Sequence, residues 1–313
     1  MLRYLVTGAN GFVGLPLCLS LLRQGAKVRG SVRQASIYLA PGIETYVAGS
    51  IHDMTDWQAA LTGIDCVIHL AATVHRPDIQ DPVIYKTTIT DASTALFKQA
   101  IAAGVKRFIY VSTSHVYGVE GSLNLIGESC VRNPCSSYGH AKMEAEDNLL
   151  ALGEKSAIEL VIVRPPLIYG PGVGGNMAQL INLVRKLPIL PLGLAEQKRS
   201  FVGLDNFIAF LQLCAENPQA ANKIFNISDD HDLSTRELCE ILAKSMGKKL
   251  SFISVSPKVL RFVLKTIGKE AVFSKLFEPL RLDITQAKLI LGWHPPFSVE
   301  QQFQKMLAGG MHE

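Results

Sequence analysis

Short apolar runs alternate with longer helical stretches through the first half of the chain, and this order constrains the fold most. The runs are rich in β-branched residues, as buried parallel strands are: Arg3–Thr7, Lys27–Val32, Glu44–Val47, Cys66–Leu70, Arg107–Ser112 and Glu159–Arg164. The stretches between them suit helices: Phe12–Gln24, Asp56–Leu61, Pro82–Ala103 and Ser137–Leu152. Strand and helix in strict turn predict an α/β fold, a doubly wound parallel sheet with helices on both faces.

Glycines follow these helical stretches at Gly25, Gly63, Gly104 and Gly153. A residue in the left-handed conformation often ends a helix, and glycine adopts it without steric cost. The glycines therefore predict where the four helices end.

Composition excludes several classes of protein. The 313 residues are 48% hydrophobic and 19% charged, which excludes a disordered or fibrous chain. A net charge of +4 is too small to indicate nucleic-acid binding. No apolar run reaches a membrane-spanning length, the first strand leaves no room for a signal peptide, and the six cysteines form no C-x-x-C pair. We expect a soluble cytoplasmic protein with mostly buried thiols and no metal site.

Three glycines follow the first strand at the spacing G-x-x-G-x-x-G. The first permits a tight turn, the second lets the backbone approach a pyrophosphate, and the third allows the helix to pack closely on the sheet. Because the run joins a strand to a helix, it predicts a dinucleotide-binding turn, although a turn without a ligand would use the same glycines. The predicted contacts are Gly8, Asn10, Gly11, Phe12, Val13 and Gly14.

The end of the second strand bears on the choice between NAD and NADP. NAD-binding proteins usually place an acidic side chain there for the ribose 2′-hydroxyl, whereas NADP-binding proteins place an arginine. The segment Val28–Arg33 contains no Asp or Glu, and Ser31 and Arg33 could hold a 2′-phosphate. Arg33 could equally be a solvated loop residue, so the choice stays open, with Arg33 in favour of NADP.

A tyrosine and a lysine lie four residues apart at the start of a predicted helix. Tyr138 and Lys142 therefore project from one face of that helix. A free tyrosine titrates at about pH 10, but a neighbouring ammonium and an oxidised nicotinamide ring both favour the phenolate and lower the pKa of a phenol. We expect Lys142 to make Tyr138 an acid/base group that works near neutral pH.

Hydroxyl side chains at Ser112, Thr113 and Ser114 follow another predicted strand. They lie at the carboxyl end of that strand, where open α/β sheets bind their ligands. One of them could bind a substrate oxygen and share its proton with Tyr138. A structural role is the alternative, with the hydroxyls satisfying a strand end and Tyr138 part of a core.

The alternation loosens after Pro165. Ser200–Leu204 and Lys223–Ile227 predict strands that return to the sheet, whereas the capping pattern before Thr235–Met246 begins a helical region. We expect residues 1–165 and 200–228 to form a Rossmann-type NAD(P)-binding domain. Residues 166–199 and 229–313 would form a smaller, mainly C-terminal α/β lobe that binds substrate.

The glycine turn, the hydroxyl-bearing strand end and the Tyr/Lys pair occur in the order typical of the extended short-chain dehydrogenase/reductase family, which the chain resembles. The closer resemblance is to the branch of nucleotide-sugar epimerases, dehydratases and reductases, which includes bacterial UDP-sugar 4-epimerases and 4-ketoreductases. Further matching segments extend it almost end to end: Val67–Ala72, Gly104–Tyr110, Arg164–Pro171, Arg199–Asp205 and Leu291–Pro295.

The resemblance implies roles for individual residues. Thr113, four residues before Tyr117, would be the catalytic hydroxyl beside Tyr138 and Lys142. It implies substrate contacts at Ser114, His115, Asn176, Arg199 and Arg281, with the arginines on a diphosphate. It implies further cofactor contacts at Ser50, Ile51, Leu70, Ala71, Ala72, Ser112, Tyr138, Lys142 and Pro165. It also implies a homodimer formed through helices within Pro82–Ala103 and Ser137–Leu152.

Three departures from the family pattern concern substrate and cofactor. Lys86–Asp91 replaces a segment in which the family often has Asn before Gly-Thr, Ser50 replaces an Asp that commonly contacts adenine, and Leu167 replaces an Asn. These changes set the chain apart from the best-known galactose epimerases and leave the sugar open.

We expect an NAD(P)-dependent nucleotide-sugar 4-epimerase, similar to UDP-glucose 4-epimerases and acting on a nucleotide sugar that is UDP-linked. Tyr138 would take the proton of the C4 hydroxyl and Thr113 would hold that oxygen while hydride passes to the cofactor. An NADPH-dependent 4-ketoreductase of a UDP-(N-acetylamino)-deoxyhexos-4-ulose in polysaccharide biosynthesis would use the same side chains. A dehydratase is disfavoured, because Ser114-His115 replaces its usual Asp-Glu. The alternative from another class is a non-catalytic NADP-binding regulatory protein, which the retained Tyr138 and Lys142 disfavour.

The stretch Pro257–Leu280 is amphipathic and basic. Its five cations, opposed only by Glu270 and Glu278, are Lys258, Arg261, Lys265, Lys269 and Lys275. Such a face can lie on anionic lipid, which would give a peripheral membrane contact. A lobe helix with its apolar side in the core is the alternative, and we favour it.

Overall fold

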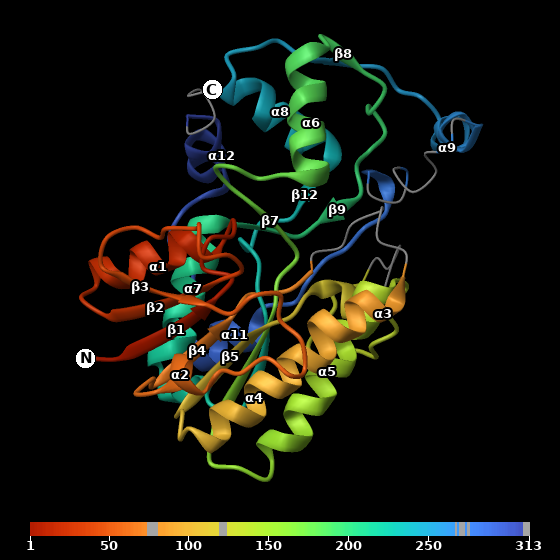
Figure 1. The fold of residues 1–313 in the computed structure, drawn as a ribbon. Coiled ribbons are helices and arrows are strands. Elements are labelled where there is room, and N and C mark those ends of the chain that lie inside the picture. Colours follow the sequence, from red (N-terminus) through yellow and green to blue (C-terminus); the bar gives the residue numbers. More distant parts are fainter. Residues whose placement is uncertain (74–80, 119–123, 267, 269–272, 274–275, 309–313) are drawn as a thin grey trace.

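A seven-stranded parallel sheet forms the centre of the larger part of the computed structural model (Figure 1). The structure describes residues 1–73, 81–118, 124–266, 268, 273 and 276–308. The strand order is β11-β6-β5-β4-β1-β2-β3. The strands are β1 Arg3–Thr7, β2 Lys27–Val32, β3 Ile43–Val47, β4 Cys66–His69, β5 Arg107–Val111, β6 Glu159–Arg164 and β11 Lys223–Asn226. The predicted doubly wound parallel sheet is confirmed.

Alternate residues of the strands supply two separate cores. Tyr4 and Val6 of β1 enter one core with α1 Gly14–Arg23, α7 Leu204–Glu216 and α11 Thr285–Leu291. Leu5, between them, points into the other core. The helical elements on that face are α2 Gln58–Leu61, α3 Pro82–Tyr85, a π-helix Lys86–Asp91, α4 Ala92–Ala102 and α5 Ser137–Gly153. The order of the strands reverses between β1 and β4, which is where such sheets bind dinucleotides.

A third core belongs to a lobe that lies above the carboxyl ends of the strands (Figure 1). Its helices are α6 Gly175–Lys186, α8 Thr235–Ser245, α9 Pro257–Thr266 and α12 Val299–Ala308. Three two-stranded pairings accompany them: β7 Leu167–Tyr169 with β10 Phe201–Gly203, β9 Lys198–Arg199 with β12 Leu233–Ser234, and β8 Ile189–Leu190 with β13 Ser251–Phe252. Short 3₁₀ turns occupy Ser114–Tyr117 and Pro218–Ala220. The capping box predicted at Ser234 and Glu237 is present.

Several local predictions were wrong. The segment predicted as Ser200–Leu204 forms a strand that pairs with β7 rather than joining the seven-stranded sheet. Gly153 is the last residue of α5 and has no positive φ, whereas Gly25, Gly63 and Gly104 have φ of 82°, 69° and 72°. The single helix predicted over 82–103 is interrupted by the π-helix.

Four of the six cysteines are buried, but Cys130 and Cys135 are exposed. Among the described residues, no helix is long and apolar enough to cross a membrane. The predicted domain boundaries and the predicted homodimer stay predictions.

Candidate functional site

The turn between β1 and α1 is built around contacts that only glycine permits. Gly8 has φ of 69°, a conformation that favours glycine. A Cβ on Gly14 would lie 2.1 Å from the Gly8 carbonyl oxygen, so the helix begins directly against the turn. The first turn of α1 has neither a side-chain cap nor an acidic residue, and its positive end is therefore open to an anion. These features fit the pyrophosphate of a dinucleotide.

A buried histidine fixes the opposite wall of this turn. Thr7 Oγ1 accepts hydrogen bonds from the Leu70 and Ala71 amides at 3.1 and 3.0 Å, so its own proton goes to His69 Nδ1 at 2.7 Å. His69 Nε2 then donates to Ser93 Oγ at 3.0 Å. Burial lowers the pKa of His69 to about 3, which keeps the ring neutral. The network holds the predicted contacts Leu70 and Ala71 beside Gly8.

The end of β2 presents a cation and no carboxylate. Arg33 is exposed, and in the described part of the chain it makes neither a hydrogen bond nor an ion pair. Ser31 is buried, and its carbonyl accepts from the Ala9 amide at 3.1 Å. Ser50 is exposed and Ile51 half-buried in the segment after β3. Of these residues, Arg33 has the reach and the charge to meet a phosphate.

The structure brings Thr113 and Tyr138 together at the carboxyl end of β5. The Thr113 hydroxyl hydrogen-bonds the Tyr138 phenol. Burial raises the pKa of this phenol to about 12, and the hydrogen bond from Thr113 opposes that rise with a smaller effect. The ring of His115 meets Tyr138 edge-on, with 6.0 Å between ring centroids. Ser136 caps the helix that carries Tyr138, accepting from the Gly139 amide at 3.1 Å.

Lys142 lies one turn further along α5 and is only 3% exposed. Its amine donates to the Val111 carbonyl at 2.8 Å and lies 4.6 Å from the centre of the Tyr110 ring. Burial lowers the pKa of Lys142 to about 7, against a smaller opposing effect of the Glu146 carboxylate. With this pKa the amine is only partly charged at neutral pH, and burial raises the pKa of Tyr138 in this structure. The effect of an ammonium here on the Tyr138 pKa stays a prediction.

Replacing Lys142 with Met should change how stability depends on pH. The amine has a pKa of about 7 when folded and of about 10.5 in the unfolded chain, so between these values the unfolded state holds an extra proton. Stability of the native chain therefore rises with pH across this window, by at most about 1.4 kcal/mol per pH unit. We expect Lys142→Met to lose this slope in urea unfolding at several pH values. Lys155→Met, at an exposed lysine just beyond α5, should keep it, and equal slopes in wild type and Lys142→Met would contradict the argument.

The side chain of Ser112 is a further candidate for a ligand contact. Its Oγ is buried and has no hydrogen-bond partner among the described residues, although its amide donates to the Val163 carbonyl at 2.8 Å. Its neighbour Ser114 is also buried, and the Ser114 amide donates to the Pro165 carbonyl at 2.9 Å. A buried hydroxyl without a partner is costly, so Ser112 fits a bound polar group.

Beneath Lys142, a buried ion network fixes α5 to the sheet. Arg164 donates to both oxygens of Glu146, at 3.0 and 2.6 Å, and to the Tyr117 hydroxyl at 2.9 Å. Arg132 adds a third bond to Glu146 at 3.1 Å. Glu146 is one further turn along α5 from Lys142, so the network sets the position of the Tyr138 and Lys142 side chains.

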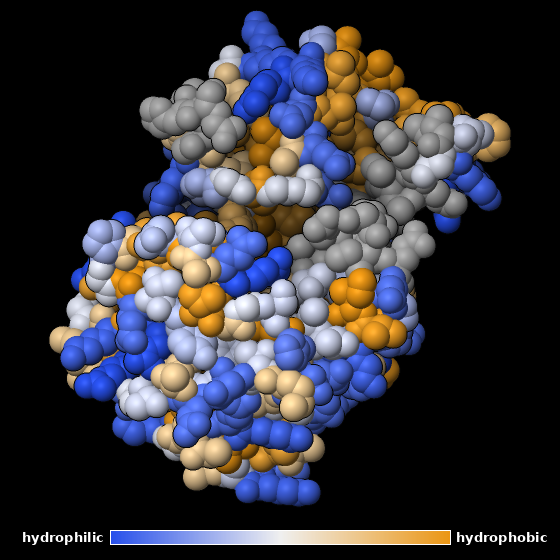
Figure 2. Space-filling model, in the orientation of Figure 1, coloured by the Kyte–Doolittle hydropathy of each residue, from blue (hydrophilic) through white to orange (hydrophobic). Residues whose placement is uncertain are grey.

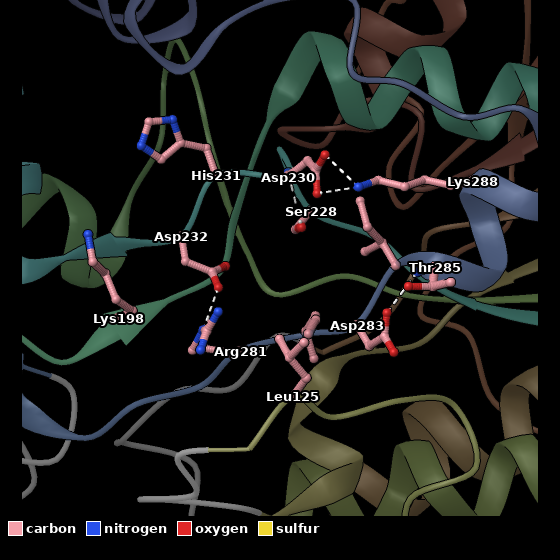
Figure 3. Close-up of a pocket in the computed structure, with 12 residues that line it drawn as sticks. Leu125, Lys198, Ser228, Asp230, His231, Asp232, Arg281, Asp283, Thr285 and Lys288 are labelled. Carbon is pink, nitrogen blue, oxygen red and sulfur yellow. Dashed lines mark hydrogen bonds and ion pairs between the residues drawn. The ribbon is translucent and has the colours of Figure 1, made fainter.

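The predicted substrate residues lie in several places. The backbone of Arg199 forms a β-bridge with Leu280, so Arg199 lies close to Arg281. The Arg199 guanidinium donates to the Glu278 carbonyl. Arg281 lies on a pocket of about 640 Å³ and donates to Asp232 at 2.8 Å (Figure 3). Asn176 is exposed in the first turn of α6. Thr113, Tyr138 and Lys142 do not line this pocket.

Sequence reasoning missed most residues of that pocket. In Figure 3, Lys288 pairs with Asp230, and His231 points away from both. The polar run Asp229–Asp232, shortly after the end of β11 at Asn226, was the available signal, because strand ends in such sheets carry ligand contacts. Within the described ranges, no cluster of His, Cys, Asp and Glu could hold a metal ion.

Comparison with known proteins adds sequence relatives. The model of the NAD dependent epimerase/dehydratase family matches residues 4–228. A UDP-glucose 4-epimerase of Vibrio cholerae is 37% identical over 308 residues, which cover 96% of this chain and 93% of the relative. An N-acetyl-alpha-D-glucosaminyl-diphospho-ditrans,octacis-undecaprenol 4-epimerase of Escherichia coli O157:H7 is 27% identical over 79% of this chain and 73% of its own length.

Solved structures share the fold over nearly the whole chain. A UDP-glucuronic acid 4-epimerase from Bacillus cereus, in complex with NAD, superimposes with a TM-score of 0.79 at 23% identity and 98% coverage of each chain. A UDP-glucose 4-epimerase from Thermotoga maritima with UDP-glucose gives 0.78 at the same identity and coverage. The family model and the Vibrio relative together confirm the resemblance inferred from the motifs. The chain therefore belongs to the NAD-dependent epimerase/dehydratase family and is an enzyme of that family.

Proposed function

We propose that this enzyme is a nucleotide-sugar 4-epimerase that acts on a UDP-linked hexose with NAD. The observation that carries the proposal is the hydrogen bond between Thr113 and Tyr138 at the sheet edge beside the glycine turn. The similarity to the UDP-glucose 4-epimerase of Vibrio cholerae, at 37% identity over almost the whole chain, supports the choice of reaction.

The side chains divide the proton chemistry between them. When bound, the dinucleotide supplies a nicotinamide that takes hydride from the sugar C4 and returns it. The Thr113 hydroxyl holds the C4 oxygen, and Tyr138 accepts its proton and later returns it. Lys142, with a pKa of about 7, is partly protonated at neutral pH and can then favour the Tyr138 phenolate one helical turn away. Ser112 would satisfy its buried hydroxyl on the bound ligand.

A 4-ketoreductase using NADPH is the second candidate, and one observation favours it. Arg33 is exposed at the end of β2, and the segment Val28–Arg33 contains no Asp or Glu that could bind a ribose 2′-hydroxyl. The same Tyr138 and Thr113 would then protonate the C4 oxygen of a 4-keto sugar after a single hydride transfer.

Product analysis separates the two candidates. The purified chain is incubated with UDP-glucose, UDP-N-acetylglucosamine or UDP-glucuronic acid, each with NAD or NADP, and the C4 configuration is followed by NMR. We expect one of these sugars to equilibrate with its C4 epimer without net cofactor turnover. NADPH oxidation that requires a 4-keto sugar, with no epimer formed from any UDP-sugar, would replace the epimerase by the reductase.

Arg33→Ala should discriminate between the cofactors. A charge-assisted hydrogen bond contributes about 1.5–3 kcal/mol, so losing one to a 2′-phosphate weakens binding roughly tenfold to a hundredfold. We expect the variant to bind NAD as wild type does and NADP at least about tenfold less tightly. Titration of both cofactors measures this, and an equal loss for both would show that Arg33 does not distinguish them.

We also propose a homodimer through the helices on the α5 face of the sheet. Val83 and Ile84 of α3 are 63% and 41% exposed beside α5, which is an unusual position for apolar side chains. Analytical ultracentrifugation should give twice the monomer mass for the wild-type chain, and Val83→Lys should shift the measured mass toward that of the monomer.

A further inference from the structure

The helix α9 exposes much of its apolar surface. It projects from the side of the lobe, away from the seven-stranded sheet (Figure 1). None of its residues is buried. Val259, Phe262 and Val263 expose 54%, 68% and 46% of their surface. Three large apolar side chains thus face outward on one short helix, whereas soluble surfaces usually expose them singly.

The charge on α9 has one sign. Its ionisable residues are Lys258, Arg261 and Lys265, and Pro257–Thr266 contains no Asp or Glu. At roughly 100° per residue, Lys258, Phe262 and Lys265 lie within about 60° of one another around the helix axis. Figure 2 shows hydrophobic and hydrophilic residues side by side at the position of α9.

The opposite side of α9 holds the helix on the lobe. Leu260 packs against the lobe core. The Arg261 guanidinium lies over the Phe273 ring, 5.6 Å from its centre, and Phe273 stacks on buried Phe277 with 4.8 Å between centroids. These contacts fix which face of α9 points outward. The basic stretch Pro257–Leu280 extends beyond α9, but Ile267, Lys269, Glu270 and Lys275 lie outside the described residues.

We propose that α9 docks this enzyme on an anionic lipid surface. A helix that exposes apolar side chains next to cations can lie in a membrane interface, with the apolar side chains inserted and the long cationic side chains reaching the headgroups. Phe262 and Val259 would enter the acyl boundary while Lys258 and Lys265 meet lipid phosphates. This inference does not depend on the proposed reaction.

The charge pattern favours lipid over a second copy of the chain. A two-fold contact through α9 would place Lys258 and Lys265 of one copy against the same residues of the other, and like charges across an interface repel. An anionic bilayer supplies the opposite charge along the whole helix, and each cation near such a surface strengthens binding roughly fivefold.

The test is sedimentation with vesicles. The full chain is mixed with vesicles of phosphatidylethanolamine and phosphatidylglycerol, or of phosphatidylcholine alone, at low and at high salt. We expect sedimentation with the anionic vesicles at low salt and loss of it at high salt. The double variant Lys258→Gln/Lys265→Gln should weaken the partition coefficient roughly 25-fold, and Phe262→Ser roughly tenfold.

Matched variants elsewhere on the surface serve as controls. Lys155→Gln/Lys223→Gln removes the same charge, and Leu289→Ser removes an apolar side chain that is 80% exposed on α11. These should bind vesicles as wild type does, and the unfolding midpoint of every variant should be unchanged. Failure of wild type to bind anionic vesicles, or equal binding by the α9 variants, would overturn the proposal. A change of oligomeric state in Phe262→Ser without vesicle binding would assign α9 to a contact between copies instead. Neither result bears on the epimerase assay.

Discussion

Tyr138→Phe is expected to lower turnover by about 10³- to 10⁴-fold while the protein remains folded. The phenol is the group placed to move a proton at the sugar C4 oxygen, since Thr113 already hydrogen-bonds it. Phenylalanine keeps the ring contact with Tyr85, whose centroid lies 6.1 Å away, and therefore keeps the packing. The loss should fall on the chemical step, so the Michaelis constant should change little.

Steady-state assays with the sugar that the enzyme converts measure this, together with the unfolding midpoint and a cofactor titration. Tyr46→Phe is a matched control, because it removes a hydroxyl that, within the described part of the chain, donates to the Asp56 carbonyl alone, at 2.8 Å. That variant should retain turnover within a factor of about two, since one surface hydrogen bond contributes only about 1 kcal/mol to stability. Near wild-type turnover in Tyr138→Phe would reject the proposed mechanism.

Strand positions could be predicted from the sequence because buried parallel strands are continuous apolar runs. β1, β2 and β6 begin and end at the predicted residues. Strand partners could not be predicted in the same way. Phe201–Gly203 has the composition of a sheet strand, but it pairs with β7, since pairing depends on where the chain leads after Pro165 and not on the run itself.

The Tyr/Lys pair shows the limit of arguments from spacing. Four residues of separation correctly placed Tyr138 and Lys142 on one face of α5, but they did not reveal that Lys142 is 3% exposed. Burial disfavours the ammonium, and the pKa of Lys142 falls to about 7. The predicted electrostatic effect on Tyr138 therefore depends on a proton that the amine only partly holds at neutral pH.

The hydrogen bonds that hold the site in place could not be predicted from the sequence either. His69 stands within the apolar run of β4, and nothing in that run indicates that it bonds Thr7 and Ser93 on two other elements. Such contacts join residues more than twenty positions apart in the chain. They become visible only once the sheet order brings β1 beside β4.

Gly14→Ala is the change expected to damage cofactor binding most. The new Cβ would lie 2.1 Å from the Gly8 carbonyl oxygen and 2.9 Å from Ala9 Cα, distances that real structures do not tolerate. Both neighbours are backbone atoms, so α1 and the turn must move apart. Displacing the helix end from a pyrophosphate forfeits one or two charge-assisted hydrogen bonds, or roughly 10- to 10,000-fold in NAD affinity. Overpacking should also reduce stability by about 1–3 kcal/mol.

Two other glycines separate these effects. Gly11 is exposed, and a Cβ on it would lie 3.1 Å from the Gly8 carbonyl oxygen. Gly11→Ala should therefore fold nearly normally. It should still weaken NAD binding if a pyrophosphate lies against this backbone. Gly25 has φ of 82° and open space around its Cβ position, so Gly25→Ala should lose about 1 kcal/mol of stability and leave NAD affinity unchanged. Calorimetric titration and urea unfolding of the three variants would measure both quantities. If the turn binds the cofactor, NAD affinity must respond to changes in the turn itself and not to strain at the far end of α1. An equal loss of NAD affinity in Gly25→Ala and Gly11→Ala would therefore mean that the glycine turn is only a structural element.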